Sequence, residues 1–172
     1  MGTLRVCSQS KTEGRSGLDR HGGNRPELRL QEAAHRAELS PYSVNTSVWI
    51  DRLRQKGNRA AKQLCRILEG GVPYGLCGLI YQEVLQGARR DEDFERLRDY
   101  LSSQRFYHPK DALSTYTEAA RIYFRCRREG ITVRSTADCL IARIAVEHNL
   151  IPLHNDRGFE QIALVVEDLN LA

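Results

Sequence analysis

From residue 42 onward, short runs of β-favouring residues alternate with longer runs whose apolar residues recur at helical spacing. The expected strands are residues 42–45, 72–77, 105–109, 150–156 and 164–169. The expected helices are residues 47–55, 58–71, 79–90, 91–103, 112–130, 135–149 and 157–163. Strands joined by helices pair in parallel through right-handed crossovers. The pattern therefore predicts an α/β fold, a three-layer α/β/α sandwich around a central, mainly parallel sheet.

The first 40 residues differ from the rest of the chain. They are rich in Gly, Arg, Glu and Ser and poor in aliphatic residues, apart from a short run at 28–40 that is compatible with a helix. We expect a mostly disordered leader over 1–40, or a start assigned upstream of the true one, and a single domain over 41–172. The leader has no apolar stretch typical of a secretory signal, and its acidic residues disfavour a mitochondrial one.

Composition narrows the class only modestly. Hydrophobic residues make up 41% of the chain and charged residues 28%, and no apolar run approaches the roughly 20 residues that a membrane helix needs. The net charge of +4 fits an anionic partner without requiring one. The five cysteines form no CxxC pair, which favours reduced thiols in the cytoplasm. We expect a cytoplasmic protein without a membrane segment.

Polar residues gather where the predicted strands end or the following helices begin. They are Asn45, Thr46, Ser47, Glu83, Asp138, Asn155 and Asp156. Because ligands of open parallel sheets bind beyond the carboxyl ends of the strands, we expect these side chains to converge. Neighbouring carboxylates repel one another, so such a cluster implies a bound cation. Oxygen ligands without Cys or His indicate Mg²⁺ or Mn²⁺.

Each of these residues also has a purely structural interpretation. Asp138 follows Ser135 by three residues, which resembles a capping box. Glu83 fits an ordinary solvated helix position, and Asp156 fits a turn or a helix N-cap. Asn45 fits a turn held by its own side chain. Their joint placement, and no single residue, favours a site.

Four segments carry a resemblance to a known family. The segments "VNTSVWID", "LIYQEVLQG", "TADCLIARIA" and "LHNDRGF" resemble, in order and spacing, the four motif regions of PIN-domain ribonucleases, most closely the VapC-like toxins of type II toxin–antitoxin systems. The resemblance covers residues 42–172. It implies that Glu83, Asp138 and Asp156 bind one or two Mg²⁺ or Mn²⁺ ions and that Ser47 supports the site. It also implies hydrolysis of RNA phosphodiester bonds in tRNA, rRNA or mRNA, a homodimer, and a small cognate antitoxin protein as partner.

Two positions depart from the family pattern. Asn45 stands where the first metal-binding aspartate is usual, and Gly158 stands where the fourth motif usually has a second acid. Asn45 still offers a carbonyl oxygen as a ligand, but it has no charge and cannot act as a base. The implied function is a Mg²⁺-dependent endoribonuclease toxin impaired by Asn45. The alternative is a catalytically weak PIN domain that regulates by binding RNA or its antitoxin.

Basic residues around this site are candidates for RNA contacts, although each also fits a solvated helix face. They are Arg89, Arg90, Lys110, Arg125, Arg127, Arg128 and Arg134, of which Arg89, Arg90 and Arg134 are preferred. A phospho-receiver domain is a rival of another class. It needs a phosphorylatable aspartate after the third strand, where this chain has "YHP".

Overall fold

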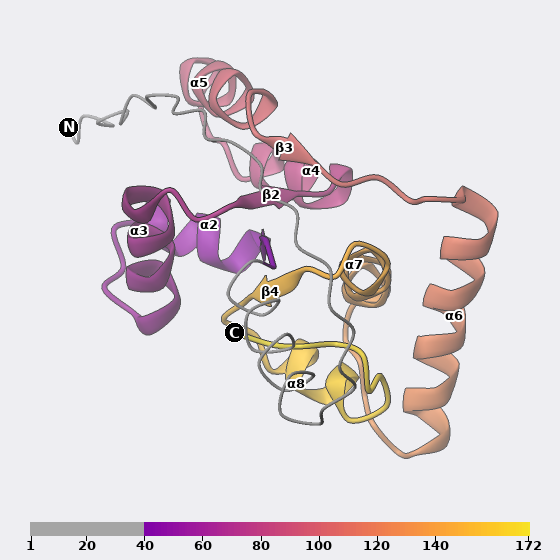
Figure 1. The fold of residues 1–172 in the computed structure, drawn as a ribbon. Helices are drawn as coiled ribbons and strands as arrows, with labels where there is room; N and C mark the ends of the chain where they lie inside the picture. The colour runs from indigo at the N-terminus through magenta and orange to yellow at the C-terminus, as the bar shows by residue number, and fades with distance from the viewer. Residues whose placement is uncertain (1–39) are drawn as a thin grey trace, which may run out of the picture. The chain divides into compact units, whose positions relative to one another are not determined.

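The centre of the fold is a four-stranded sheet in which all strands are parallel (Figure 1). The computed structural model describes residues 40–172, so the leader predicted over 1–40 and its short helix lie outside the described residues, Ser40 excepted. The strands are β1 (Tyr42–Val44), β2 (Tyr74–Leu76), β3 (Arg105–Phe106) and β4 (Ile151–Leu153). Each coincides with an expected strand but is shorter.

The strand order β3-β2-β1-β4 decides where a site forms. The chain builds outward from β1 through β2 to β3 and then returns to add β4 on the other side of β1. Val44 pairs with Leu153, so β1 and β4 end side by side. The strand order reverses between them, and crevices at such reversals bind ligands in parallel α/β sheets.

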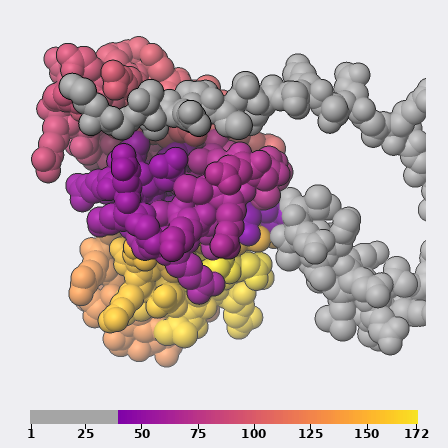
Figure 2. Space-filling view, turned by 90° about the vertical axis from the view of Figure 1, so that its left-hand side faces the viewer, coloured from indigo at the N-terminus to yellow at the C-terminus, as the bar shows by residue number. Residues whose placement is uncertain are grey.

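Helices connect the strands and cover the sheet. They are α2 (Thr46–Leu53), α3 (Arg59–Gly70), α4 (Gly78–Gln86), α5 (Asp91–Ser102), α6 (Ala112–Arg128), α7 (Thr136–Glu147) and α8 (Arg157–Ala163). In Figure 1, α2 and α3 lie on one side of the sheet and α6 and α7 on the other. Figure 2 shows the α2–α3 side, where residues of these helices lie between the α5 region and the C-terminal residues. This arrangement is the predicted three-layer α/β/α sandwich.

One continuous core joins the sheet to both helix layers. Its largest fully buried side chains include Phe159, Leu64, Leu76, Ile80, Leu101, Ile141 and Ile162. Three of the four cysteines in the described part of the chain, Cys77, Cys126 and Cys139, are buried in this core as free thiols. In residues 40–172, no helix has the length and apolar character that crossing a membrane requires.

The prediction of a fifth strand over 164–169 is wrong. This segment forms turns that continue from α8, because the amides of Val165 and Val166 both donate to the carbonyl of Ile162. Val165 and Leu169 still reach the core from these turns. A short apolar run has the same composition in a strand and in a helical turn, and here packing on α8 selected the turn.

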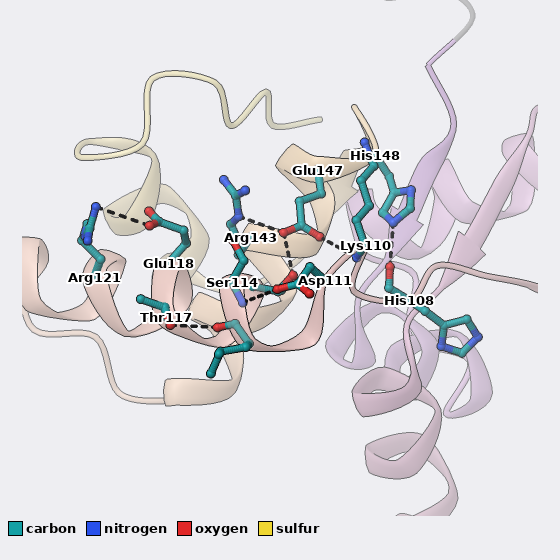
Figure 3. A network of polar contacts seen from close by, with 12 residues as sticks. His108, Lys110, Asp111, Ser114, Thr117, Glu118, Arg121, Arg143, Glu147 and His148 are labelled. Carbon is teal, nitrogen blue, oxygen red and sulfur yellow. Dashed lines mark hydrogen bonds and ion pairs between the residues drawn. The ribbon is translucent and has the colours of Figure 1, made fainter.

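A polar network fixes α6 against the end of α7 (Figure 3). The buried carboxylate of Glu147 accepts hydrogen bonds from the Thr115 hydroxyl, the Arg143 guanidinium and the Lys110 amide. His148 contacts the carbonyl of His108 at 2.7 Å. These bonds hold the loop between β3 and α6 and the start of α6 against the C-terminal end of α7.

Candidate active site

Asn45 lies at the end of β1 and is the N-cap of α2. Its amide donates to the carbonyl of Leu153 (3.0 Å), which binds the end of β1 to the end of β4. Its side-chain oxygen accepts from the amide of Thr46 (2.7 Å), and the residue is 5% exposed. The structural interpretation of Asn45 therefore holds, and it places the side chain at the edge of the sheet where the predicted site should form.

Glu83 comes from α4 and is tied to the same corner. The hydroxyl of Thr46 donates to a carboxylate oxygen of Glu83 at 2.5 Å, across 37 residues of sequence. Glu83 is half-buried and hydrogen-bonded, so the interpretation of Glu83 as an ordinary solvated helix residue does not hold. Thr46 belongs to the polar triplet after β1, but nothing in the pattern distinguished it from its neighbours.

Asp138 lies in the first turn of α7, whose N-cap is Ser135. The Ser135 hydroxyl accepts from the amide of Ala137 (3.2 Å), so within residues 135–138 the capping does not use the Asp138 carboxylate. The pKa of Asp138 is raised to about 6, mainly by burial and in smaller part by the negative charges of Asp156 and Glu83. The Asp138 carboxylate is therefore partly buried and lies near two other acids.

Asp156 follows β4 and is the N-cap of α8. One of its oxygens accepts from the amide of Gly158 at 2.9 Å, so its N-cap role is real. A Cβ atom on Gly158 would lie 3.0 Å from an oxygen of Asp138 and 3.5 Å from an oxygen of Asp156. Both carboxylates therefore border Gly158, and a side chain there would require a small shift of Asp138.

Ser47 contacts the loop after β4 and not a carboxylate. Its hydroxyl accepts from the amide of Asn155 at 3.3 Å. Asp51, one turn further along α2, accepts from the side-chain amide of Asn155 at 2.9 Å. Asp51 is not among the site residues expected from the sequence, because an acid in a helix is ordinarily solvated. The structure buries Asp51 and exposes its neighbours Arg52 and Leu53.

The acids fit a hard divalent cation in their chemistry. Within residues 40–172, no three His, Cys, Asp or Glu side chains lie close enough together to form a ready metal cage. Asp156 and Glu83 nevertheless lie near enough to Asp138 for their charges to add to the effect of burial on its pKa. A cation would relieve this repulsion, and carboxylate oxygens are the ligands that Mg²⁺ and Mn²⁺ prefer.

The arginines expected to contact RNA are exposed, and one of them is paired with an acid. Arg89 and Arg134 are exposed, the latter four residues before Asp138. Arg90 is 68% exposed and forms a two-pronged pair with Asp93 at 2.9 and 3.0 Å, in the first turn of α5. The charge of Arg90, the N-cap residue of α5, is thus already matched by an acid in the first turn of that helix.

The fold and this corner define a parallel α/β protein with an acidic cluster at the reversal of its strand order. The family model described as "PIN domain" matches residues 42–165. Two curated relatives, "VapC ribonuclease Mb1587" of Mycobacterium bovis and "Ribonuclease VapC11" of Mycobacterium tuberculosis, are each 35% identical over 123 residues. Each alignment covers 71% of this chain and 91% of the relative. The chain belongs to the PIN domain family, and within it to the VapC-like ribonuclease toxins.

Solved structures have the same fold. One is the VapBC2 complex of Rickettsia felis bound to a DNA fragment from its promoter, with a TM-score of 0.56 and 15% identity. Another is VapBC-1 from nontypeable Haemophilus influenzae, with a TM-score of 0.57 and 16% identity. Each covers 76% of this chain and 96% of its own. These neighbours confirm the predicted PIN-like architecture.

Proposed function

We propose that this protein is a metal-dependent endoribonuclease of the VapC type whose activity is reduced by Asn45. The observation that carries the proposal is the proximity of three acids from α4, α7 and the β4–α8 loop. Burial raises the pKa of Asp138, and the charges of Asp156 and Glu83 raise it in the same direction. A fold without a ligand gains nothing from such repulsion.

In this proposal Asp138, Asp156 and Glu83 hold Mg²⁺ or Mn²⁺, and Asn45 adds at most a neutral oxygen. When bound, the cation supplies Lewis-acid stabilisation of phosphoryl charge and lowers the pKa of an attacking water. The protein contributes orientation. The Thr46 hydroxyl fixes the carboxylate of Glu83, and the Gly158 amide fixes one oxygen of Asp156.

Asn45 weakens the site because it lacks a negative charge. For unit charges about 4 Å apart, the missing interaction is about 1 kcal/mol in water and roughly 4 kcal/mol at an effective dielectric of 20. Metal occupancy at low concentration would then fall by roughly fivefold to a thousandfold. The side-chain oxygen of Asn45 is also engaged by the Thr46 amide, which reduces its capacity as a ligand.

The second candidate is a PIN domain that binds RNA or an antitoxin without cutting. The capping bond of Asn45 favours it, because this side chain has a complete structural role without a metal. For either candidate we propose RNA in the cytoplasm as the ligand, with Arg89, Arg90 and Arg134 as backbone contacts. We further propose an antitoxin partner, supported by the VapBC complexes among the structural neighbours. A homodimer is proposed on the family resemblance alone.

The test compares the natural chain with Asn45→Asp. Both are incubated with end-labelled tRNA, rRNA and mRNA in Mg²⁺, in Mn²⁺ and in EDTA. Cleavage by the aspartate form alone, and only with metal, supports an impaired nuclease. Cleavage by both makes Asn45 a tolerated ligand. If neither form cuts any RNA but both retain it, the binding candidate replaces the nuclease.

A further inference from the structure

Asp51 is a buried carboxylate in the second half of α2. Its side chain is only 8% exposed, and such burial of an acid requires compensation by partners. The Lys56 ammonium lies 2.9 Å from one oxygen, and a hydrogen bond from Lys56 is the main reason that the pKa of Asp51 falls below its usual value. The other oxygen accepts from the side-chain amides of Asn58 (2.5 Å) and Asn155 (2.9 Å).

These partners connect Asp51 to two separate parts of the fold. Asn58 is the N-cap of α3, where its oxygen accepts from the amide of Ala61 at 2.9 Å. Asn155 lies in the β4–α8 loop, directly before Asp156. One link is to a neighbouring helix and the other is to the acidic cluster.

Two positions of α2 hold Asn155. Ser47 and Asp51 are four residues apart and so lie on the same face of the helix. Ser47 accepts from the backbone amide of Asn155, and Asp51 accepts from its side chain. A residue held at both its backbone and its side chain leaves the next residue, Asp156, little freedom.

We propose that Asp51 is a positioning residue, which acts through Asn155 to fix Asp156 beside Asp138. The proposal rests on the proposed function only in treating these acids as a metal site. It gives Asp51 a role in the site, in addition to the hydrogen bond that Asp51 accepts from Asn58, the N-cap of α3. Its consequence is that the strength of metal binding depends on a side chain that does not touch the metal.

The first test is metal-free, so that it stands whether or not the protein is a nuclease. Amide hydrogen exchange of Gly158, whose amide is bonded to Asp156, is measured by NMR in EDTA for the full chain, Asp51→Ala, Asn155→Ala and the double variant. Loss of a hydrogen bond to a charged group should speed this exchange roughly tenfold. The double variant should match the singles, because both changes break the same link.

Asn58→Ser is the matched control. Serine keeps an oxygen that can cap α3 but loses the amide that donates to Asp51. Amides of α3 should exchange faster in this variant, because its N-cap residue is no longer bonded to Asp51. The exchange of the Gly158 amide should be unchanged. Unchanged Gly158 exchange in Asn155→Ala, which leaves Asp51 its other two partners, would overturn the positioning role. So would an equal effect of Asn58→Ser on Gly158.

The second test uses Mn²⁺ alone, with binding followed by electron paramagnetic resonance. Asp51→Ala and Asn155→Ala should each raise the Kd about tenfold, and Asn58→Ser should leave it unchanged. If the natural chain binds Mn²⁺ and all variants bind it equally, the positioning role fails. If even Asn45→Asp binds no Mn²⁺, the proposed function fails, and the exchange of Gly158 alone decides the role of Asp51.

Discussion

Replacing Asp138 by asparagine should stabilise the metal-free protein. The change removes a charge that burial disfavours and that Asp156 and Glu83 repel, and it keeps the shape of the side chain. The raised pKa of Asp138 is therefore a statement about stability. Folding forces this carboxylate into surroundings that disfavour its ionised form.

The size and sign follow from the shift. The pKa rises from 3.8 to about 6, and each unit corresponds to about 1.36 kcal/mol. The upper bound is thus about 3 kcal/mol. Because Asp138 is only half-buried and solvent screens part of the repulsion, we expect roughly 1–2 kcal/mol. The destabilisation by ionised Asp138 is fully present above the folded pKa and disappears as the pH falls below the unfolded pKa. The stability gained by Asp138→Asn should therefore be large at about pH 8 and near zero at about pH 4.

Urea unfolding in EDTA measures this, with the single tryptophan, Trp49, as a buried fluorescent probe. Asp99→Asn on α5 is the control, because its side chain is 70% exposed and should show no such gain. Added Mg²⁺ should then stabilise the natural chain more than Asp138→Asn. No gain at about pH 8, or an equal gain at about pH 4, would refute the electrostatic reasoning.

Three further predictions concern the fold and the corner of the site. Gly75→Ala should cost about 3 kcal/mol of stability or prevent folding, because the new Cβ would lie 2.4 Å from the backbone oxygen of Arg105 on the paired strand. Gly78→Ala is the control and should fold normally, because a Cβ there meets open space. Equal melting curves for the two variants would contradict the prediction. Glu147→Gln should cost about 1–3 kcal/mol near neutral pH. Burial acts to raise the pKa of Glu147, but its hydrogen bonds lower the pKa overall. The ionised carboxylate therefore stabilises the fold above its unfolded pKa of 4.5, and this stabilisation is lost as the pH falls. A stability difference between the two proteins that grows in acid would contradict the prediction. Thr46→Val should cost about 1 kcal/mol by leaving Glu83 without its donor, whereas Thr46→Ser should not; calorimetry of the two variants gives the comparison.

Much of the fold was readable from local pattern. The seven helices and four strands of residues 40–172 fall where periodicity and glycine stops placed them, because each depends on near neighbours in the chain. The segment 164–169 was misread because its apolar run fits a strand or a turn equally well, and only its packing on α8 distinguishes them.

The candidate acids could also be selected from the sequence, since strand ends in a parallel sheet meet at one edge. By itself the sequence determined the α/β class, the family, and the candidate acids Glu83, Asp138 and Asp156. Tertiary structure alone decided that Thr46 holds Glu83 and that Asp51 is buried against Asn155, 104 residues away. The physical reason is that hydrogen-bond partners and burial depend on residues distant in the chain, which no local pattern encodes.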